Sequence, residues 1–330
     1  MHNKRLWFIG LALISVVSST LAQTTVVFSD VAVLPMNTTK ILPHQDVVVE
    51  NGLIKTIKPT ARNKYANATV IDASGKYLMP GLADMHVHLP RKDQFGYGLD
   101  QFFQLHLAAG ITTLRSMRGD EADPELQRLI GEGKKLAPDL YISAPPFSAR
   151  YWLSSDSLTR LVRQYKSSGF QLLKVLSIPS VTWYDTLTQI ARKENIRLAG
   201  HAPAGVLFAK ALGQGIGCIE HLGGYETLPI DKPDFDEAVQ RTLANKVYNC
   251  PTLDWYFVNY TQITLDSLKR RRGLDRLPTA LLQSWNQTME NYLSQQARKH
   301  PDSLRKEQVA ENQYVLHKLE VLKRLYPESH

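Results

Sequence analysis

The sequence is poor in cysteine, because its 330 residues include only Cys218 and Cys250. Two cysteines cannot make the dense disulfide framework that stabilises small secreted domains. The fold must therefore rest on a hydrophobic core, which a chain of this length can bury. Each cysteine lies in an apolar, strand-like segment, and buried free thiols are the preferred interpretation. A disulfide between neighbouring strands is the alternative.

Long apolar runs are missing after the N-terminus, and no later stretch is long and apolar enough to span a bilayer. Residues 1–22 are typical of an export signal, since Lys4 and Arg5 precede the short apolar run 6–17 and residues 20–22 (TLA) offer a small-residue cleavage site. We therefore expect an exported protein, periplasmic or extracellular, with no membrane attachment after signal cleavage. An uncleaved N-terminal anchor is the alternative.

Motifs for nucleotides and nucleic acids are also lacking. No glycine-rich phosphate loop follows the first strand-like segment of the main domain, which argues against a doubly wound nucleotide-binding sheet. The formal net charge is +8, and part of the excess is the run 269–272 (KRRR). We interpret this run as a solvated helix face, and we expect no nucleic-acid partner. A module that binds anionic partners through the basic tail is the least favoured functional hypothesis.

The pattern of predicted secondary structure changes near residue 79. Residues 23–78 contain short β-rich segments, and Asn51-Gly52 between two of them is a hairpin signal. From residue 79 onward strand-like and helical segments alternate, which predicts a parallel sheet covered by helices. The seven predicted strands are residues 81–88, 111–117, 139–144, 172–177, 197–202, 217–222 and 247–253.

Helical periodicity fills the gaps between these strands. Seven strand–helix units in one domain, residues 79–330, predict an α/β fold with a TIM-like (β/α)₈ barrel that lacks its eighth strand. The tail, about residues 263–326, is charged and helical and is interrupted by Pro278 and Pro301. The predicted helices between the strands are residues 125–135, 157–166, 183–193, 206–212 and 235–245.

His86 and His88 end the first strand of the predicted barrel. Side chains two residues apart on a strand point to the same face, so both imidazoles are expected to converge. They would lie at the barrel mouth, where enzymes of this architecture place their chemistry. An isolated His-x-His pair is weak evidence, and its position directly after residues 80–85 (PGLADM) makes it specific.

Lys174 lies in the middle of the apolar strand segment 170–176. A buried ammonium group is costly, so burial lowers the pKa of a lysine and makes the neutral amine available. A neutral amine can combine with carbon dioxide to form a carbamate, whose oxygens could bridge two metal ions. A lysine that reaches solvent from an edge strand is the alternative.

His201 and His221 each end an apolar strand before a loop that contains glycine or proline. Together with His86, His88 and Lys174 they recur at the ends of strands one, four, five and six, which predicts a metal site. Imidazole and carboxylate-type ligands suit Zn²⁺ best, with other divalent transition metals as alternatives. Two ions that share an oxygen would supply hydroxide near neutral pH and polarise the carbonyl of an amide, lactam or ester.

These segments, in this order, resemble the amidohydrolase superfamily, in the branch that contains imidazolonepropionase and dipeptidases acting on Xaa-Pro. The resemblance extends from about residue 25 onward. It rests on residues 80–88, 110–119, Lys174 in its strand, 200–201, 220–221 and 250–253.

The resemblance implies a centre of two divalent ions, most simply two Zn²⁺. In the family pattern His86 and His88 hold one ion, His201 and His221 hold the other, and carboxylated Lys174 bridges them. It also implies an N-terminal β-sandwich completed by strands from the C-terminus. The expected substrate is a small molecule or a dipeptide whose carbon–nitrogen bond is hydrolysed.

The family's final ligand has no counterpart in the sequence, so the catalytic proton acceptor is unassigned. In the family an aspartate after the eighth strand binds a metal and accepts the proton of the attacking hydroxide. Asp266, Asp275 and Asp302 of the tail end no strand-like run, and we interpret them as helix caps or surface charges. A truncated, inactive amidohydrolase is therefore the alternative to an active one. Tyr225 is a candidate substrate contact, with loop packing as its alternative.

Overall fold

The computed structural model describes residues 25–61, 65–91, 98–260, 265–296 and 301–327, so the signal predicted at residues 1–22 lies outside the described part. The contacts between residues divide the chain into two compact units, residues 1–80 and 81–330. None of the helices described here combines the length and the hydropathy that a membrane span requires.

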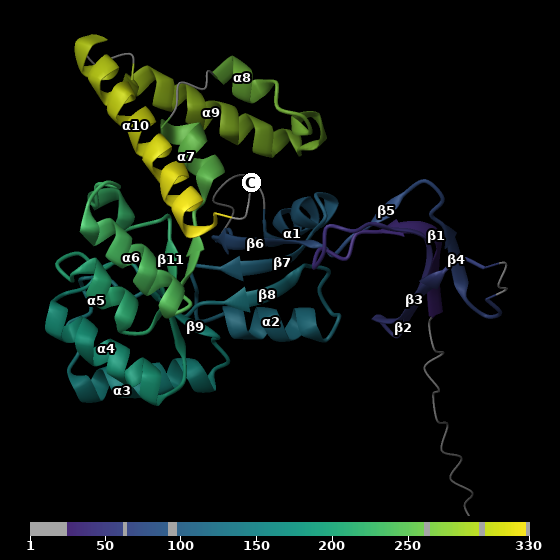
Figure 1. Cartoon of the computed structure of the whole chain (residues 1–330), viewed down its shortest axis with the longest axis horizontal. Helices are drawn as coiled ribbons and strands as arrows, with labels where there is room; N and C mark the ends of the chain where they lie inside the picture. Colours follow the sequence, from purple (N-terminus) through teal and green to yellow (C-terminus); the bar gives the residue numbers. More distant parts are fainter. Residues whose placement is uncertain (1–24, 62–64, 92–97, 261–264, 297–300, 328–330) are drawn as a thin grey trace, which may run out of the picture. The chain divides into compact units, whose positions relative to one another are not determined.

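The first unit contains one five-stranded sheet (Figure 1). Its strands are β1 Thr25–Val33, β2 Leu42–Glu50, β3 Leu53–Pro59, β4 Thr69–Asp72 and β5 Tyr77–Leu78. Asn51 and Gly52 join β2 to β3 with φ angles of 51° and 79°, which confirms the predicted hairpin. All strands described in this unit belong to that sheet, so the second layer of a β-sandwich stays a prediction.

The second unit contains all seven predicted parallel strands, in chain order. They are β6 Leu82–Val87, β7 Ile111–Ser116, β8 Asp139–Ile142, β9 Leu172–Val175, β10 Arg197–Gly200, β11 Ile216–Glu220 and β12 Tyr248–Cys250. Strands β6 to β8 form one sheet and β9 to β12 another. Parallel bridges from Ser143 to Leu172 and from Phe147 to Val175 connect the segment after β8 to β9. The α/β class is thus confirmed, and closure into a barrel stays a prediction.

The five helices predicted between the strands are also present, with ends shifted by a few residues. They are α2 Asp123–Gly131, α3 Ser155–Ser167, α4 Val181–Lys193, α5 Phe208–Gly213 and α6 Pro233–Ala244. Helix α1, Leu99–Ala108, was not predicted. Its N-cap is Gly98, whereas the start of a helix is usually recognised in a sequence by Ser, Thr, Asp or Asn at that position.

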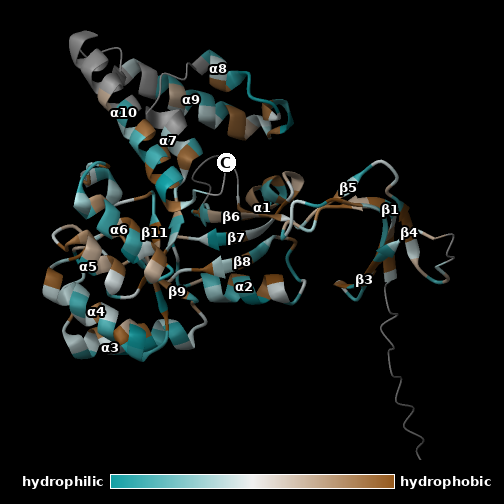
Figure 2. Cartoon of the chain, in the orientation of Figure 1, coloured by the Kyte–Doolittle hydropathy of each residue, from teal (hydrophilic) through white to brown (hydrophobic). Residues whose placement is uncertain are grey.

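The core of this unit lies between the strands and their helices. Helix α3 buries Leu158, Val162 and Tyr165, which recur at helical spacing and therefore lie on one face. Figure 2 shows the corresponding mixture of apolar and polar residues along α3 and α4. Strand β9, in contrast, is buried at all four positions, so its sequence does not have to alternate between apolar and polar residues. This packing fixes the positions of the strand ends, which carry the residues of the candidate site.

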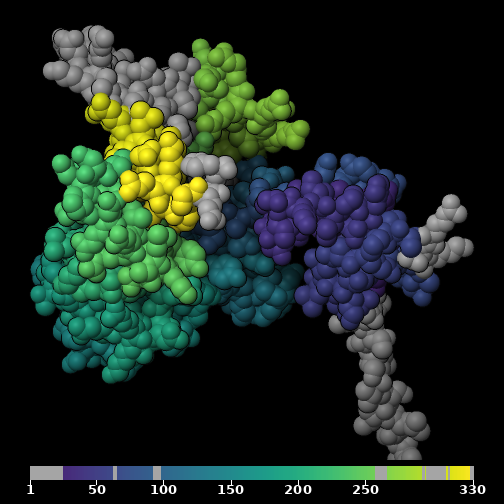
Figure 3. Space-filling view, viewed as in Figure 1, coloured from purple at the N-terminus to yellow at the C-terminus, as the bar shows by residue number. Residues whose placement is uncertain are grey.

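The elements described after Cys250 are all helical, within residues 251–260, 265–296 and 301–327: α7 Leu253–Tyr260, α8 Leu265–Lys269, the short 3₁₀ helix η2 Leu274–Arg276, α9 Thr279–Gln296 and α10 Pro301–Leu325. The predicted helical tail is therefore confirmed, and the predicted last strand ends three residues early. Asp266 and Asp275 are exposed on helical segments, as expected for surface charges. The C-terminal part of α10 packs against α6 and α7 (Figures 1 and 3).

Candidate metal centre

Four histidines gather where β6, β10 and β11 end. The ring centroids of His86 and His88 are 5.4 Å apart, those of His86 and His221 are 4.5 Å apart, and those of His201 and His221 are 5.2 Å apart. The structure therefore brings together all four histidines that the sequence pattern marks as ligands. They come from segments as far apart in sequence as residues 86 and 221, and the parallel arrangement of the strands places them at one end.

Lys174 lies beside this group on β9, a strand that pairs with β10 and is bridged to the segment after β8. Its side chain is 1% exposed, and its Nζ has no hydrogen-bond partner among the described residues. Burial lowers the pKa of Lys174 to about 8, although the charge of Glu220 opposes the shift. The alternative of a lysine that reaches solvent is thus wrong: β9 ends its four-stranded sheet, but the side chain of Lys174 is buried.

Three of the histidines are held neutral. Burial, followed by the charges of neighbouring groups, lowers the pKa of His88 and of His201 to about 4 and that of His221 to about 3. The neutral ring is the form that binds metal ions, so these three residues need not release a proton at neutral pH.

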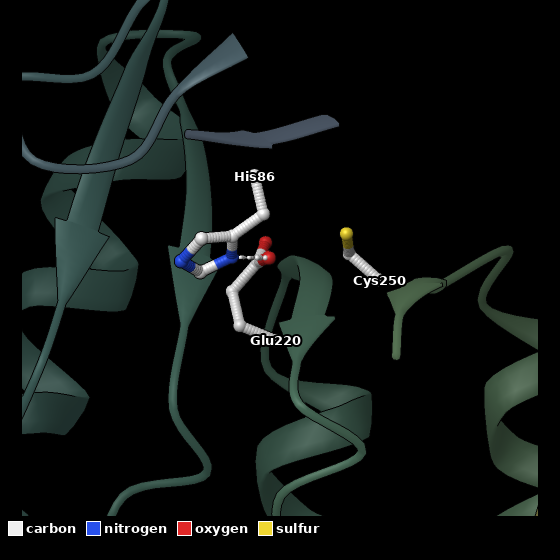
Figure 4. A group of neighbouring side chains, drawn as sticks. All are labelled: His86, Glu220 and Cys250. Atoms are coloured by element: carbon white, nitrogen blue, oxygen red, sulfur yellow. Dashed lines mark hydrogen bonds and ion pairs between the residues drawn. The ribbon is translucent and has the colours of Figure 1, made fainter. Parts of the chain in front are cut away.

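Glu220 orients His86 (Figure 4). Its Oε2 lies 2.6 Å from His86 Nδ1, and its Oε1 accepts a hydrogen bond of 2.8 Å from Arg115. Burial would raise the pKa of Glu220, but the hydrogen bond from His86 and the charge of Arg115 hold it below its usual value. With Nδ1 engaged, the other ring nitrogen, which Figure 4 shows on the side away from Glu220, is left for a metal.

Glu220 forms part of a second cluster with His86 and Cys250, in which one ligand atom of each residue lies within 4.8 Å of the others (Figure 4). We interpret this cluster as support for His86, because the carboxylate is already shared between His86 and Arg115. Burial also raises the pKa of the Cys250 thiol to about 11, which keeps it protonated and a poor ligand. Both cysteines are free, as predicted.

His221 sits on a strained backbone. Its φ is 62°, and the next residue, Leu222, has a φ of 55°, both in the left-handed region that costs an ordinary residue roughly 1–2 kcal/mol. Nδ1 of His221 lies 2.7 Å from Oγ1 of Thr252, and the backbone N–H of His221 donates to the carbonyl of Cys250 at 2.8 Å. Such strain persists only where the surroundings hold it, and it is typical of functional sites.

Tyr225, the candidate substrate contact, is fully buried. Its ring packs on Phe208 and Phe235, and its hydroxyl forms a hydrogen bond with Thr242. Burial raises the pKa of the phenol to about 12. A side chain with no exposed surface cannot contact a substrate without rearrangement, so the structure corrects the expected contact in favour of loop packing.

A cavity of about 650 Å³ opens among the starts of the same strands, and its lining includes Thr113, Arg197 and Tyr248. Each of these residues comes from the first half of its strand, whereas the histidines lie at strand ends. The lining also includes Arg115 and Cys250, which lie beside Glu220, but none of the four histidines. The chemistry of the donor atoms therefore identifies the site better than the size of the cavity does.

Gly200 is required by the close approach of β10 to β9. Its φ is 150°, and a Cβ added there would lie 2.0 Å from the carbonyl oxygen of Val175. We expect Gly200→Ala to lower the free energy of unfolding by about 3 kcal/mol, because overpacking adds to backbone strain. Thermal unfolding of the metal-free protein measures the loss. Gly213→Ala is the control, since its Cβ meets only Arg241 at 3.6 Å; equal stability of the two variants would contradict the expectation.

The neutral histidines predict that the metal-free protein loses stability in acid. A histidine in the unfolded chain takes up a proton near pH 6.5, whereas His88, His201 and His221 do so only near pH 3–4 in the fold. The unfolded state therefore binds more protons between these values, and stability falls as pH drops from about 6.5 to about 4. Thermal unfolding over this range tests it. A His88→Gln/His201→Gln variant should show a shallower dependence; an identical slope would contradict the assignment.

Comparison with known proteins shows related folds and short matched segments. No protein-family model matches the chain. The fold is similar to that of a bottromycin amidohydrolase, with a TM-score of 0.64 and 19% identity over 92% of this chain and 66% of that one. It is also similar to a Xaa-Pro dipeptidase with bound methionine, with a TM-score of 0.60 and 14% identity over 92% of this chain and 89% of that one.

The curated matches are shorter. A dihydroorotase of Trichlorobacter lovleyi is 64% identical over 44 residues, which are 13% of this chain and 10% of that protein. An adenine deaminase of Methanococcoides burtonii is 27% identical over 187 residues, which are 50% of this chain and 30% of that protein. The chain thus spans from a tenth to less than a third of the length of these two relatives.

Proposed function

Because the chain is related to the amidohydrolase superfamily in its fold and in its matched sequence segments, we propose that it hydrolyses carbon–nitrogen bonds with the help of divalent metal ions. The observation that carries this proposal is the gathering of four histidines beside a buried lysine amine that has no hydrogen-bond partner in the described part of the chain. A lysine that only packed would leave that amine desolvated with nothing to offset the cost.

The residues fit a pair of ions. His86 and His88 would hold one ion, His201 and His221 would hold the other, and Lys174 would join them as a carbamate. The lowered pKa of Lys174, about 8, leaves part of the amine neutral at physiological pH, and only the neutral amine can take up carbon dioxide. Bound divalent ions would supply a hydroxide near neutral pH and polarise a carbonyl. Zn²⁺ is our first choice because imidazole and carboxylate-type oxygen suit it best.

For the substrate we propose a small molecule or dipeptide with an amide or cyclic amide bond. The names of the relatives support this class, since they include a dihydroorotase, a dihydropyrimidinase and a Xaa-Pro dipeptidase. We further propose that the protein acts after export, on the basis of its signal-like residues 1–22.

The test uses the purified full chain, loaded with Zn²⁺ and offered a panel of dipeptides, linear amides, cyclic amides and lactones. We expect metal-dependent turnover that disappears in His201→Ala and persists in His44→Ala, an exposed histidine of the first unit. Metal content is measured on the same samples. Binding of metal without turnover would favour an inactive amidohydrolase, and absence of metal binding would overturn the proposal.

A further inference from the structure

A second buried lysine contacts the candidate site from the C-terminal helix. The side chain of Lys318 on α10 is fully buried, and its Nζ donates a hydrogen bond to the backbone carbonyl of His221. The same Nζ lies 4.4 Å from the ring centroids of both Tyr256 and Tyr314 and 3.6 Å from Oε2 of Glu226. Three different elements therefore surround one ammonium group, and its hydrogen bond reaches the backbone of a metal-ligand candidate.

The groups around Nζ of Lys318 suit a positive charge. Aromatic faces attract an ammonium group, and the attraction grows when water is excluded. The carboxylate of Glu226 adds a negative charge beside the two rings, so the surroundings of Lys318 favour the protonated amine. A positive charge could anchor α10 through the tyrosines and Glu226 alone. The hydrogen bond to His221 is an additional contact that such anchoring does not require.

The carbonyl that Lys318 contacts belongs to the strained turn at the end of β11. His221 and Leu222 both have positive φ, and neither is glycine. The direction of the His221 imidazole depends on this backbone, and a charged donor on its carbonyl is among the stronger hydrogen bonds available to hold it. Thr252 holds the ring itself through Nδ1. Lys318 and Thr252 thus restrain the residue at two different points.

We propose that Lys318 is a positioning residue for His221, through which α10 sets the geometry of the metal site formed by His201 and His221. The inference rests on the proposed metal centre. It makes the C-terminal helix part of the site, although Lys318 lies 97 residues from His221 in the sequence.

The experiment measures Co²⁺ binding by the full chain in two backgrounds, each of which keeps one ion. His88→Ala leaves the ion held by His201 and His221, and His201→Ala leaves the ion held by His86 and His88. Adding Lys318→Met should weaken binding about 10–100-fold in the first background, the usual cost of losing a group that orients a ligand, and leave the second unchanged.

The control is Lys323→Met, an exposed lysine on the same helix that pairs with Glu320. It should leave binding unchanged in both backgrounds. If Lys318→Met has no effect, or weakens both ions equally, the residue only supports the fold and the inference fails. If that variant does not fold, Lys318→Gln replaces it, with the same selective loss expected. A wild-type chain that binds no Co²⁺ or Zn²⁺ would contradict the proposed function itself, which is a separate outcome.

Discussion

Lys174→Met is expected to reduce the metal content of the protein from two ions to one and to abolish metal-dependent hydrolysis. Methionine keeps the apolar volume of the side chain but cannot form a carbamate. In the metal-free protein the same change should keep or raise the free energy of unfolding, since it removes a buried amine that has no hydrogen-bond partner among the described residues. This pairing of preserved stability with lost metal binding separates a functional lysine from one that is needed for folding.

Metal analysis, thermal unfolding and hydrolysis of the best panel substrate together measure these effects. Lys193→Met, which alters an exposed lysine at the end of α4, should behave as wild type. A further check is to remove carbon dioxide from the buffers during metal loading, which should lower the uptake of the second ion until bicarbonate is restored. Two ions bound by Lys174→Met, or uptake that does not respond to bicarbonate, would show that the lysine is not the bridge.

Glu220→Gln is expected to damage both stability and metal binding. The carboxylate is fully buried and carries the ion pair with Arg115 and the contact with His86. Removing its charge leaves the positive charge of Arg115, a residue that is only 8% exposed, without an ion-pair partner at this site, which typically costs about 3–5 kcal/mol. Loss of the group that orients His86 should in addition weaken metal binding about 10–100-fold.

Urea unfolding and Zn²⁺ titration test this second expectation. Glu237→Gln is the matched control, because Glu237 also pairs with an arginine, Arg241, but on the exposed face of a helix. Such surface pairs contribute at most about 1 kcal/mol. The double variant Arg115→Met/Glu220→Gln should recover part of the stability, since it leaves no unpaired charge. A Glu220→Gln protein as stable as Glu237→Gln would show that the buried charge of Arg115 finds another partner.

Local patterns in the sequence were enough to identify the strands and the five candidate ligands on four of them. Strand spacing places His86 and His88 on one face whatever surrounds them, and the unbroken apolar context of Lys174 already predicts its burial. The parallel order of strands follows from the alternation of strands and helices, and it places His201 and His221 at the same end as the first pair. Helix α1 was not predicted from these patterns, because its N-cap, Gly98, carries no capping side chain.

The supporting contacts could not be predicted, because they join residues that are far apart in the chain. Glu220 and His86 are separated by 134 positions, and only the arrangement of β6 and β11 shows that one orients the other. The direction of Tyr225 depends on a turn with a left-handed backbone, which sends the side chain into the core. No periodic pattern in the sequence indicates such a turn.

By itself, then, the sequence determined the α/β class, the order of the strands and the residue types at the ends of four of them, because these depend on local spacing and hydrophobic pattern. The tertiary structure decided which groups are charged and which are neutral, and which residues hold His86 and His221 in place. Those properties depend on burial and on long-range contacts, as the lowered pKa of Lys174, the shared carboxylate of Glu220 and the contact of Lys318 with His221 show.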